Sequence, residues 1–192
     1  MNSNRDLFWK LTEPEHLQAR AFCRRLMGNR EDGDDLYQDA LVTAFTRFDS
    51  LRDRTAFRGW LYRVIVNRFK NRKRSPWYRR FGSLTEKIAE TAVGENPVGP
   101  RAAGRKLEIA FGAVSAEERA LVILFELEGW TIAELALMDD KSEGAIKMKL
   151  SRARKKMRAA LARRMEKAEA ASGVKTKRNE ETICVATKPS SD

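Results

Sequence analysis

The sequence is poor in the residues that bind metal ions or crosslink a chain. Its 192 residues include two cysteines, Cys23 and Cys184, and a single histidine, His16. No second ligand lies at metal-binding spacing from His16, while Cys23 falls in an apolar helical pattern and Cys184 in a polar one. We therefore expect no metal site and two reduced thiols, as in proteins of a reducing compartment.

Long apolar segments are missing too. No run approaches the roughly 20 residues that a membrane-spanning helix needs. The N-terminal segment MNSNRDLFWKL lacks the basic-then-apolar order and the small-residue cleavage site of a secretory signal. We expect a cytoplasmic protein with no membrane insertion.

The sequence also lacks the motifs of nucleic-acid enzymes. It contains no histidine cluster, no glycine-rich phosphate loop and no cysteine-based zinc motif. The acidic group Asp32, Asp34 and Asp35 could bind Mg²⁺, but carboxylates at a helix start are stabilised by the helix dipole and need no metal. We expect neither catalytic residues nor a cofactor.

Positive charge is present in two separate patches. Residues 63–80 hold eight Lys and Arg and no acid, and residues 142–165 hold nine against one acid, Glu143. Together the patches carry +16, so the rest of the chain sums to −5 of the net +11. Solvated helix faces normally mix both signs, so this segregation indicates two contacts with a polyanion, and nucleic acid fits best.

Helical periodicity without persistent strand alternation predicts an all-α fold of two small helical domains joined by a flexible linker. The first domain covers residues 1–75, the linker 76–105 and the second domain 106–165. Prolines and glycines limit the linker to one short helix near residues 84–91. Residues 166–192 lose the periodicity and are expected to form a disordered tail.

The first domain is expected to contain three amphipathic helices. One covers residues 7–27 with a break near its proline, and the next covers 34–48 with Phe45 on its buried side. The segment GNREDGDD before the second helix reads as a turn. The third helix covers 56–74, with Thr55 as its N-cap.

The second domain is expected to contain a helix-turn-helix. A Ser-x-x-Glu capping box at Ser115 and Glu118 opens a helix that ends near Gly129. The segment TIAELALM then forms a short helix, MDDKS a turn, and Ser142 caps a basic helix. Two short helices joined by a tight turn, the second basic and exposed, are typical of this DNA-binding motif.

One face of the basic helix is apolar, because Ile146, Leu150, Ala153 and Met157 recur at steps of four, three and four. A slim helix tip with basic residues behind it fits the major groove of DNA, where leading side chains reach base edges and Lys and Arg hold phosphates. The residues that we assign to this contact are Gly144, Ala145, Lys147, Met148, Lys149, Ser151, Arg152 and Arg154.

Two stretches of the sequence resemble the extracytoplasmic-function (ECF) sigma factors of the sigma-70 family. GWTIAELALMDDKSEGAIKMKLSRARKK is similar to region 4 of that family, whose motif runs aromatic-Ser/Thr, Glu-Ile-Ala, a turn, Gly-Thr-Val-Lys-Ser-Arg-Leu and Arg-Ala-Arg. DGDDLYQDALVTAFTRFDSLRDRTAFRGWLYRVIVNRFKNRKR is similar to region 2. The resemblance covers about residues 10–75 and 105–161, and two motifs in the family order are far more specific than either alone.

This resemblance implies a subunit that binds core RNA polymerase, recognises the −10 and −35 promoter elements and promotes transcription initiation. The basic helix would read the −35 element. An acidic helix face would dock the polymerase through Asp35, Gln38 and Asp39. Aromatic rings that stack on exposed bases and cations that hold phosphates would handle the −10 element. These residues are Trp60, which could equally be a core residue, with Tyr62, Arg63, Asn67, Arg68 and Lys70.

The chain departs from the family pattern where it would read DNA. Ala145 and Met148 replace the common Thr and Ser, which predicts fewer hydrogen bonds to the −35 element and more apolar contact with thymine methyls. The turn carries Asp139, Asp140 and Lys141 in place of Gly and apolar neighbours, and Asp adopts a left-handed conformation less readily than Gly.

The sequence alone leaves two further points open. The family commonly has an anti-sigma partner, which a layout of two linked domains permits. The residues alone also allow an autonomous helix-turn-helix regulator, whose N-terminal half serves dimerisation or sensing and which needs no polymerase.

Overall fold

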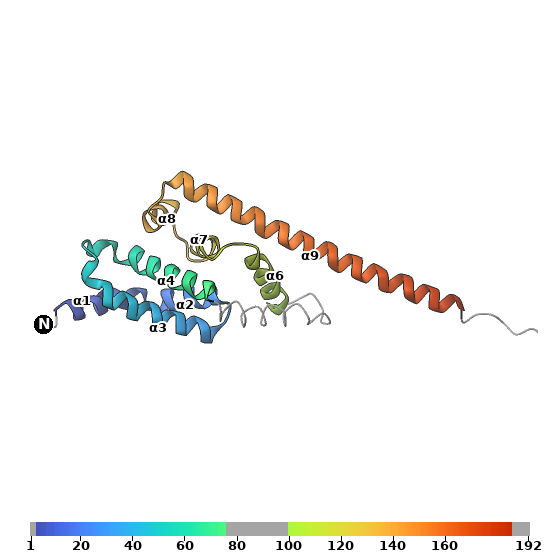
Figure 1. The fold of residues 1–192 in the computed structure, drawn as a ribbon, viewed down its shortest axis with the longest axis horizontal. Coiled ribbons are helices and arrows are strands. Elements are labelled where there is room, and N and C mark those ends of the chain that lie inside the picture. The colour runs from blue at the N-terminus through green and yellow to red at the C-terminus, as the bar shows by residue number, and fades with distance from the viewer. Residues whose placement is uncertain (1–2, 76–99, 186–192) are drawn as a thin grey trace, which may run out of the picture.

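The computed structural model describes residues 3–75 and 100–185, and every element in these two ranges is helical (Figure 1). In chain order the elements are α1 (Ser3–Thr12), the 3₁₀ helix η1 (Glu13–Glu15), α2 (His16–Met27), α3 (Arg30–Arg47), η2 (Phe48–Ser50), η3 (Arg54–Ala56), α4 (Phe57–Arg74), α6 (Pro100–Gly112), α7 (Ala116–Glu126), α8 (Ile132–Asp139) and α9 (Glu143–Val185). We call α1–α4 the N-terminal lobe and α6–α9 the C-terminal lobe. None of the described helices is long and apolar enough to cross a membrane.

The helix expected over residues 7–27 is broken near Pro14, as predicted. It consists of α1, a single 3₁₀ turn with the proline in its first positions, and α2. The next helix, α3, begins at Arg30 rather than near residue 34. The Asn29 side chain accepts a hydrogen bond from the Asp32 amide at 2.8 Å and caps the helix, so most of the expected turn is helical.

Helices α2 and α3 approach each other closely at Gly33. A Cβ atom at this position would meet the Arg24 Cα at 2.4 Å, so any larger residue would push the helices apart. Asp34, next in sequence, accepts hydrogen bonds of 2.7–2.9 Å from the guanidinium groups of Arg20 and Arg24. These bonds hold the pKa of Asp34 well below its usual range. Asp34 therefore joins two helices, and the acidic cluster has a structural explanation that requires no metal.

The start of α4 differs from the prediction. Residues 54–56 form η3, and α4 begins at Phe57, so Thr55 is not its N-cap. Asp53 caps η3 instead, because its carboxylate accepts bonds from the Thr55 amide at 2.9 Å and from the Thr55 hydroxyl at 2.6 Å, while Ala56 precedes α4 without a side-chain cap. Asp at this place favours a local turn over an immediate α-helix.

Two capping boxes define the helices of the C-terminal lobe. Ser115 and Glu118 open α7 as predicted, and Thr131 and Glu134 open α8 in the same way. In each box the hydroxyl accepts from the Glu amide while the Glu carboxylate accepts from the cap amide. Beyond α7, Gly129 takes a positive φ of 71° in the loop that leads to α8.

The turn between α8 and α9 has the geometry that a helix-turn-helix requires. Asp140 adopts the left-handed conformation with φ 54°, and the Lys141 amide donates to the Ala136 carbonyl at 3.0 Å. The Ser142 hydroxyl accepts from the Ala145 amide at 3.2 Å and caps α9, as predicted. An Asp therefore occupies the position that usually requires Gly.

The ends of the C-terminal lobe extend beyond the limits expected from the sequence. Helix α6 begins at Pro100, so residues 100–105 are helical rather than part of the linker. Helix α9 continues to Val185 and leaves the body of the molecule (Figure 1), well past residue 165, where the periodicity ends. Residues 159–171 are rich in Ala, Glu, Lys and Arg, which favour helix without an apolar stripe. The short helix expected near residues 84–91 lies outside the described residues.

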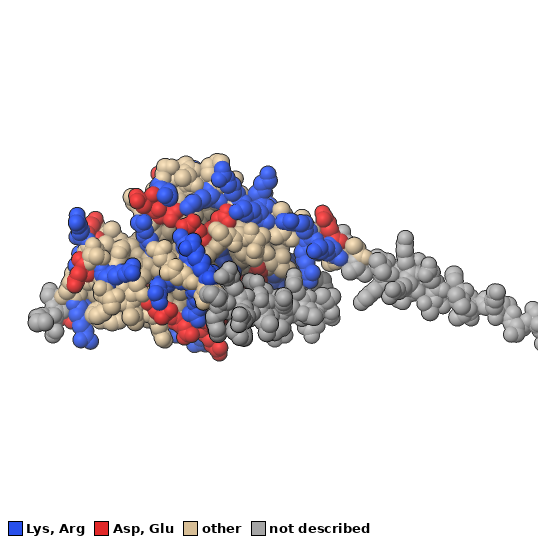
Figure 2. Space-filling view, in the orientation of Figure 1, with Lys and Arg blue, Asp and Glu red and all other residues tan. Residues whose placement is uncertain are grey.

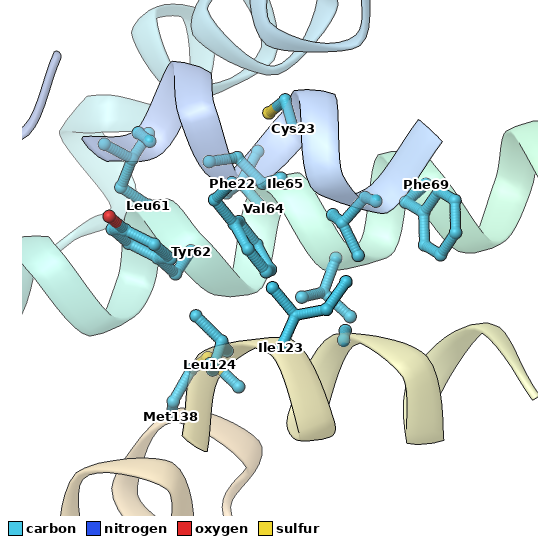
Figure 3. Close-up of a cluster of buried hydrophobic side chains, with 14 of the residues drawn as sticks. Phe22, Cys23, Leu61, Tyr62, Val64, Ile65, Phe69, Ile123, Leu124 and Met138 are labelled. Carbon is cyan, nitrogen blue, oxygen red and sulfur yellow. The ribbon is translucent and has the colours of Figure 1, made fainter. Parts of the chain in front are cut away.

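The two lobes share one hydrophobic core. A continuous cluster of buried side chains runs from α1 through α4 into α7, α8 and the first turns of α9. Figure 3 shows Ile123 and Leu124 of α7 directed toward Phe22 of α2 and Tyr62 of α4 across this contact. The all-α fold in two helical parts is confirmed. Their packing against each other was not predicted, because the sequence pattern reports only which face of each helix is apolar.

Candidate nucleic-acid and protein interfaces

The first turns of α9 present a narrow polar face to solvent. Ile146, Leu150 and Ala153 are buried under α7 and α8, which turns the opposite side of the helix outward. We call the four exposed side chains on that side the reading face: Lys147, Met148, Ser151 and Arg152. Figure 2 shows Lys and Arg side chains along this part of the surface. Met148 is 54% exposed, which is unusual for a large apolar residue on a basic helix.

Two residues predicted to contact DNA are directed toward the protein instead. Lys149 Nζ lies 2.8 Å from Asp139 Oδ2 and 3.8 Å from Glu117 Oε2. Partial burial acts to lower the pKa of Lys149, but the hydrogen bond and charge of Asp139, with the charge of Glu117, outweigh it and raise the pKa. The Arg154 guanidinium donates to Glu126 Oε1 and lies 5.3 Å from the Phe125 ring centre. Both cations therefore stabilise the lobe itself.

The tip of α9 is open. Gly144 has no atom within 4 Å of a Cβ built on it, and the neighbouring Ala145 is only partly exposed. The backbone at the start of the helix can therefore approach a large ligand closely. This geometry fits the insertion of a helix N-terminus into a groove.

The basic surface of α4 is divided between exposed and engaged residues. Arg63 and Asn67 are exposed one helical turn apart. Arg68 pairs with Asp39 at 3.3 Å, and Lys70 Nζ lies 2.7 Å from Glu117 Oε1 of the C-terminal lobe. The predicted −10 residues therefore lie on one helix but face different surroundings.

The two aromatic residues of this group belong to the core. Trp60 is half-buried against the rings of Phe48 and Phe57, which favours the core alternative noted for it. Tyr62 was expected within reach of DNA, but its side chain has no exposed surface in this arrangement. Its ring lies 4.8 Å from that of Trp130, and its burial, followed by the charge of Glu15, raises its pKa. Phe22 of α2 and Trp130 of the C-terminal lobe both cover the ring, so Tyr62 is not available to DNA in this arrangement.

A third surface lies on the outer side of α3. Asp35, Gln38 and Asp39 are exposed there as predicted, and the same side of the helix continues with Val42 and Phe45, which are 66% and 42% exposed. We call these five residues the α3 strip. In Figure 2 acidic side chains gather at the lower edge of the molecule, where Figure 1 places α3. The sequence prediction placed Phe45 in the core and so missed the apolar half of the strip.

An exposed tryptophan extends the apolar end of the α3 strip. Trp9 of α1 is 48% exposed and stacks on Phe45, with ring centres 6.3 Å apart. A surface that joins acids to unburied aromatic rings is typical of a protein-binding site rather than a DNA-binding one. Gln38, Val42 and Phe45 are spaced four and three residues apart, which places them on one side of a helix. This spacing was the signal in the sequence that could have revealed the α3 strip.

Groups of carboxylates elsewhere are engaged by cations. Among the described residues, no cluster of three or more His, Cys, Asp or Glu side chains is placed to hold a metal ion. Cys23 is buried in α2, and burial raises the pKa of its thiol, which makes it unreactive. His16 accepts or donates a 2.9 Å hydrogen bond with the Tyr37 hydroxyl on the helix surface.

The fold and these surfaces define a two-lobed, all-α protein with a helix-turn-helix and a separate strip of acidic and apolar side chains on α3. Comparison with known families refines this class. The family described as "Sigma-70 region 2" matches residues 11–78, and "Sigma-70, region 4" matches residues 106–157. The chain belongs to the ECF sigma factors of RNA polymerase, a family of transcription factors rather than enzymes.

Individual relatives support the assignment over most of the chain. The ECF RNA polymerase sigma factor SigM of Mycobacterium tuberculosis is 30% identical over 157 residues, which cover 80% of this chain and 76% of SigM. The RNA polymerase sigma factor NccH of Alcaligenes xylosoxydans xylosoxydans is 28% identical over 153 residues, covering 76% and 82%.

A solved structure agrees with the fold. The sigma factor RpoE of Bartonella quintana, crystallised in complex with the anti-sigma factor NepR, superposes with a TM-score of 0.53 at 23% identity. The match covers 80% of this chain and 98% of the RpoE chain. At this identity the likeness concerns the fold alone.

Proposed function

We propose that this protein is a sigma factor that binds core RNA polymerase, recognises the −10 and −35 promoter elements and promotes transcription initiation without catalysing a covalent step. The observation that carries the proposal is the presence, in one ECF-family chain, of an exposed reading face on α9 and an exposed α3 strip. The first surface suits duplex DNA, and the second suits a protein.

The C-terminal lobe recognises the −35 element with α9 in the major groove. Lys147, Ser151 and Arg152 supply charge and hydrogen bonds, while the exposed Met148 supplies apolar surface. In the major groove the C5 methyl of thymine is the group that such a surface recognises. Selection of bound promoters from a random library should therefore return −35 sequences enriched in T opposite Met148. Recovery of the ordinary family consensus would contradict this preference.

The N-terminal lobe, residues 1–75, handles the −10 element with α4. Arg63 and Asn67 are exposed and make the first contacts. Arg68 and Lys70 join them once their carboxylate partners are displaced by phosphates, which compete for the same cations. Exposed aromatic surface for base stacking comes from Trp60 and, after lobe separation, from Tyr62.

The α3 strip docks on core polymerase. Its acidic half complements a basic partner, and Val42 and Phe45 supply the apolar area that an exposed ion pair alone does not. The double variant Gln38→Ala/Asp39→Ala is expected to weaken polymerase binding in a pull-down with purified core enzyme. Glu13→Ala, which removes an exposed acid of η1, is the control. Equal binding by both variants would rule out the docking assignment.

Residues 76–99 connect the two lobes, and an anti-sigma factor regulates the protein in the cytoplasm. The second inference rests on family membership and on the anti-sigma complex of the RpoE neighbour, whose fold this chain shares. Co-purification from the native host would identify such a partner. Recovery of the tagged chain with polymerase subunits alone under all growth conditions would speak against it.

Run-off transcription tests the whole proposal. Purified protein is mixed with core polymerase and promoter DNA, and a transcript with a defined start is expected only when all three are present. Binding to DNA with no effect on polymerase would instead identify the autonomous helix-turn-helix regulator. The same assay without added protein measures the background of the core enzyme.

A further inference from the structure

The first turn of α9 carries the only acid of the basic patch at residues 142–165. This acid is Glu143, the first residue of the helix, and its side chain is 55% exposed. The helix tip around it is open, because a Cβ atom built on Gly144 would meet no atom within 4 Å. A carboxylate at the point where a helix enters a groove bordered by phosphates is repelled by DNA unless it gains a specific contact there.

A cation lies beside this carboxylate. Lys147 Nζ is 3.6 Å from Glu143 Oε2, one helical turn further along, and both side chains are exposed. We call Glu143 and Lys147 the α9 pair. An exposed ion pair contributes little to stability, so it does not lock the two side chains to each other. The carboxylate has several acceptor sites and the ammonium group several donors, so both members of the pair can also bind a ligand.

The backbone under the α9 pair is held in place from two sides. Ile146, which precedes Lys147, is fully buried, and its amide donates to the Ser142 carbonyl at 3.1 Å. The Ser142 hydroxyl accepts from the Ala145 amide at 3.2 Å. The core and the helix cap thus fix this turn, while its two charged side chains remain in solvent. A turn that is ordered before binding can distinguish ligands by geometry at a small cost in entropy.

The edge of a G·C base pair in the major groove has the opposite arrangement of polar groups. Cytosine offers the N4 amino donor, and guanine offers the O6 and N7 acceptors. The N4 donor and the O6 acceptor are joined by a hydrogen bond of the base pair, so they lie about 2.9 Å apart. In the α9 pair an acceptor lies 3.6 Å from a donor, which is a similar separation with the polarity reversed. The carboxylate can therefore accept from cytosine N4 while the ammonium group donates to guanine.

An A·T base pair fits the α9 pair less well. It also places a donor, adenine N6, next to an acceptor, thymine O4, but the thymine methyl group lies beside O4. Guanine instead offers a cation two acceptors on one edge. The thymine methyl group suits Met148, which follows Lys147 and is 54% exposed. The two kinds of base pair are thus matched by different side chains of the same helix.

We propose that Glu143 is a specificity-determining residue of α9, which together with Lys147 recognises one G·C base pair of the −35 element. This inference rests on the proposed function, because it names a base pair that the same helix reads. Lys147 alone would bind a guanine or a phosphate oxygen. With Glu143 beside it, a phosphate is repelled and a cytosine amino group is bound, so the acid converts a general DNA contact into a selective one.

Selection of promoters tests the role of Glu143. The −35 positions of a promoter with a fixed −10 element are randomised, and the transcripts made by the full chain with core polymerase are sequenced. The wild-type protein should prefer G·C at one −35 position by about fivefold or more over the other base pairs. Glu143→Ala should lose this preference, whereas Glu166→Ala, which removes an exposed acid farther along α9, should keep it. Retention of the preference by Glu143→Ala would overturn the proposal.

The same selection with Lys147→Ala tests whether the two side chains share one base pair. If they do, the loss of either side chain should relax the preference at the same −35 position. Relaxation at two different positions would reject the shared contact. An equal rise in transcription from every promoter with Glu143→Ala would show that the carboxylate only repels DNA, which would also reject the proposal. Circular dichroism verifies that the variants fold.

A modified base tests the contact at the level of one atom. The selected cytosine is replaced by 2-pyrimidinone, which lacks the N4 amino group, and binding of the holoenzyme to the promoter is measured. The weaker base pairing affects all variants alike, so the informative quantity is the difference between them. The loss of affinity should be about fivefold or more greater for wild type and Glu166→Ala than for Glu143→Ala. An equal loss in all three would contradict a bond between Glu143 and cytosine.

The outcomes separate this inference from the proposed function. Transcription that depends on the −35 sequence but shows no G·C preference sensitive to Glu143 would reject the inference and leave the sigma-factor activity standing. Absence of transcription from every promoter of the library would reject the proposed function, and this inference with it.

Discussion

The two lobes are built from similar helices, but they differ in how far they expose the residues that we propose to bind DNA. In the C-terminal lobe the reading face of α9 lies open to solvent, and only Lys149 and Arg154 are turned inward. In the N-terminal lobe Tyr62 is buried, and Lys70 is paired with the other lobe. Each lobe contributes a helix with many cations and few acids. Burial by a distant segment, rather than composition, decides which of them can meet DNA at once.

The largest expected effect concerns the core that the lobes share. Leu124 of α7 is fully buried where α7 faces α4 (Figure 3), so Leu124→Ala should lower the free energy of unfolding by about 2–5 kcal/mol. Urea denaturation measures the change. Leu127→Ala, three residues on and 53% exposed, is the control and should stay within about 0.5 kcal/mol. Similar losses of unfolding free energy in the two variants would contradict the deeper burial of Leu124.

A second test compares two glycines of the N-terminal lobe. Gly33→Ala should destabilise the protein by about 1–3 kcal/mol, because the new methyl group meets the α2 backbone and forces the helices apart. Gly59→Ala in α4 has open space around it and should be stabilising by about 0.5–1 kcal/mol. Thermal melts of both variants check the opposite signs. A stabilising effect of Gly33→Ala would contradict the close approach of α2 and α3.

A third test sharpens the division within α9. Arg152→Ala should weaken binding to a −35 duplex by about 1–3 kcal/mol if the side chain contacts a base. Arg154→Ala removes the same charge two residues away, but its guanidinium is held by Glu126, so a smaller loss is expected. Fluorescence anisotropy at fixed salt measures both. Equal losses would show that net charge, and not the orientation of the reading face, governs binding.

The smallest expected effect is on the acid side of the stability profile. The pKa of Asp34 is depressed in the folded state by Arg20 and Arg24, so its contribution is present above the unfolded value near 3.8 and is lost as the pH falls toward the folded value. Asp34→Asn should therefore be less stable than wild type at pH 7. The difference should narrow between about pH 4 and pH 2. Denaturation series at several pH values measure it, and a constant gap would exclude this coupling.

Local features of the structure were largely predictable. The break at Pro14, the capping box at Ser115 and the cap at Ser142 each depend on residues within one turn of the chain. The helix-turn-helix and the exposed face of α9 follow from the same short-range pattern. Thr55 was misassigned because Asp53, two residues earlier, accepts from both the amide and the hydroxyl of Thr55 and so holds residues 54–56 in a 3₁₀ turn before α4.

The candidate site was less predictable because the exposure and direction of its side chains depend on segments far away in sequence. Phe45 reads as core by its period, yet it is exposed beside Trp9, since the aromatic interior of this lobe is filled by Phe8, Phe48 and Phe57. Lys149 reads as a DNA contact, but Asp139 holds it against α8. In both cases a competing neighbour, absent from the local pattern, determines the direction of the side chain.

Spacing along the chain was enough to predict the all-α fold, the caps at Ser115 and Ser142, the two basic patches and the resemblance to the ECF sigma family. The contacts of Trp130 with Tyr62 and of Glu117 with Lys70 join residues 68 and 47 positions apart, so they depend on the tertiary structure. The pattern of an amphipathic helix predicts which face of the helix is buried, but it does not predict which surface covers that face. That choice is made by shape and charge among faces that meet only in the folded molecule.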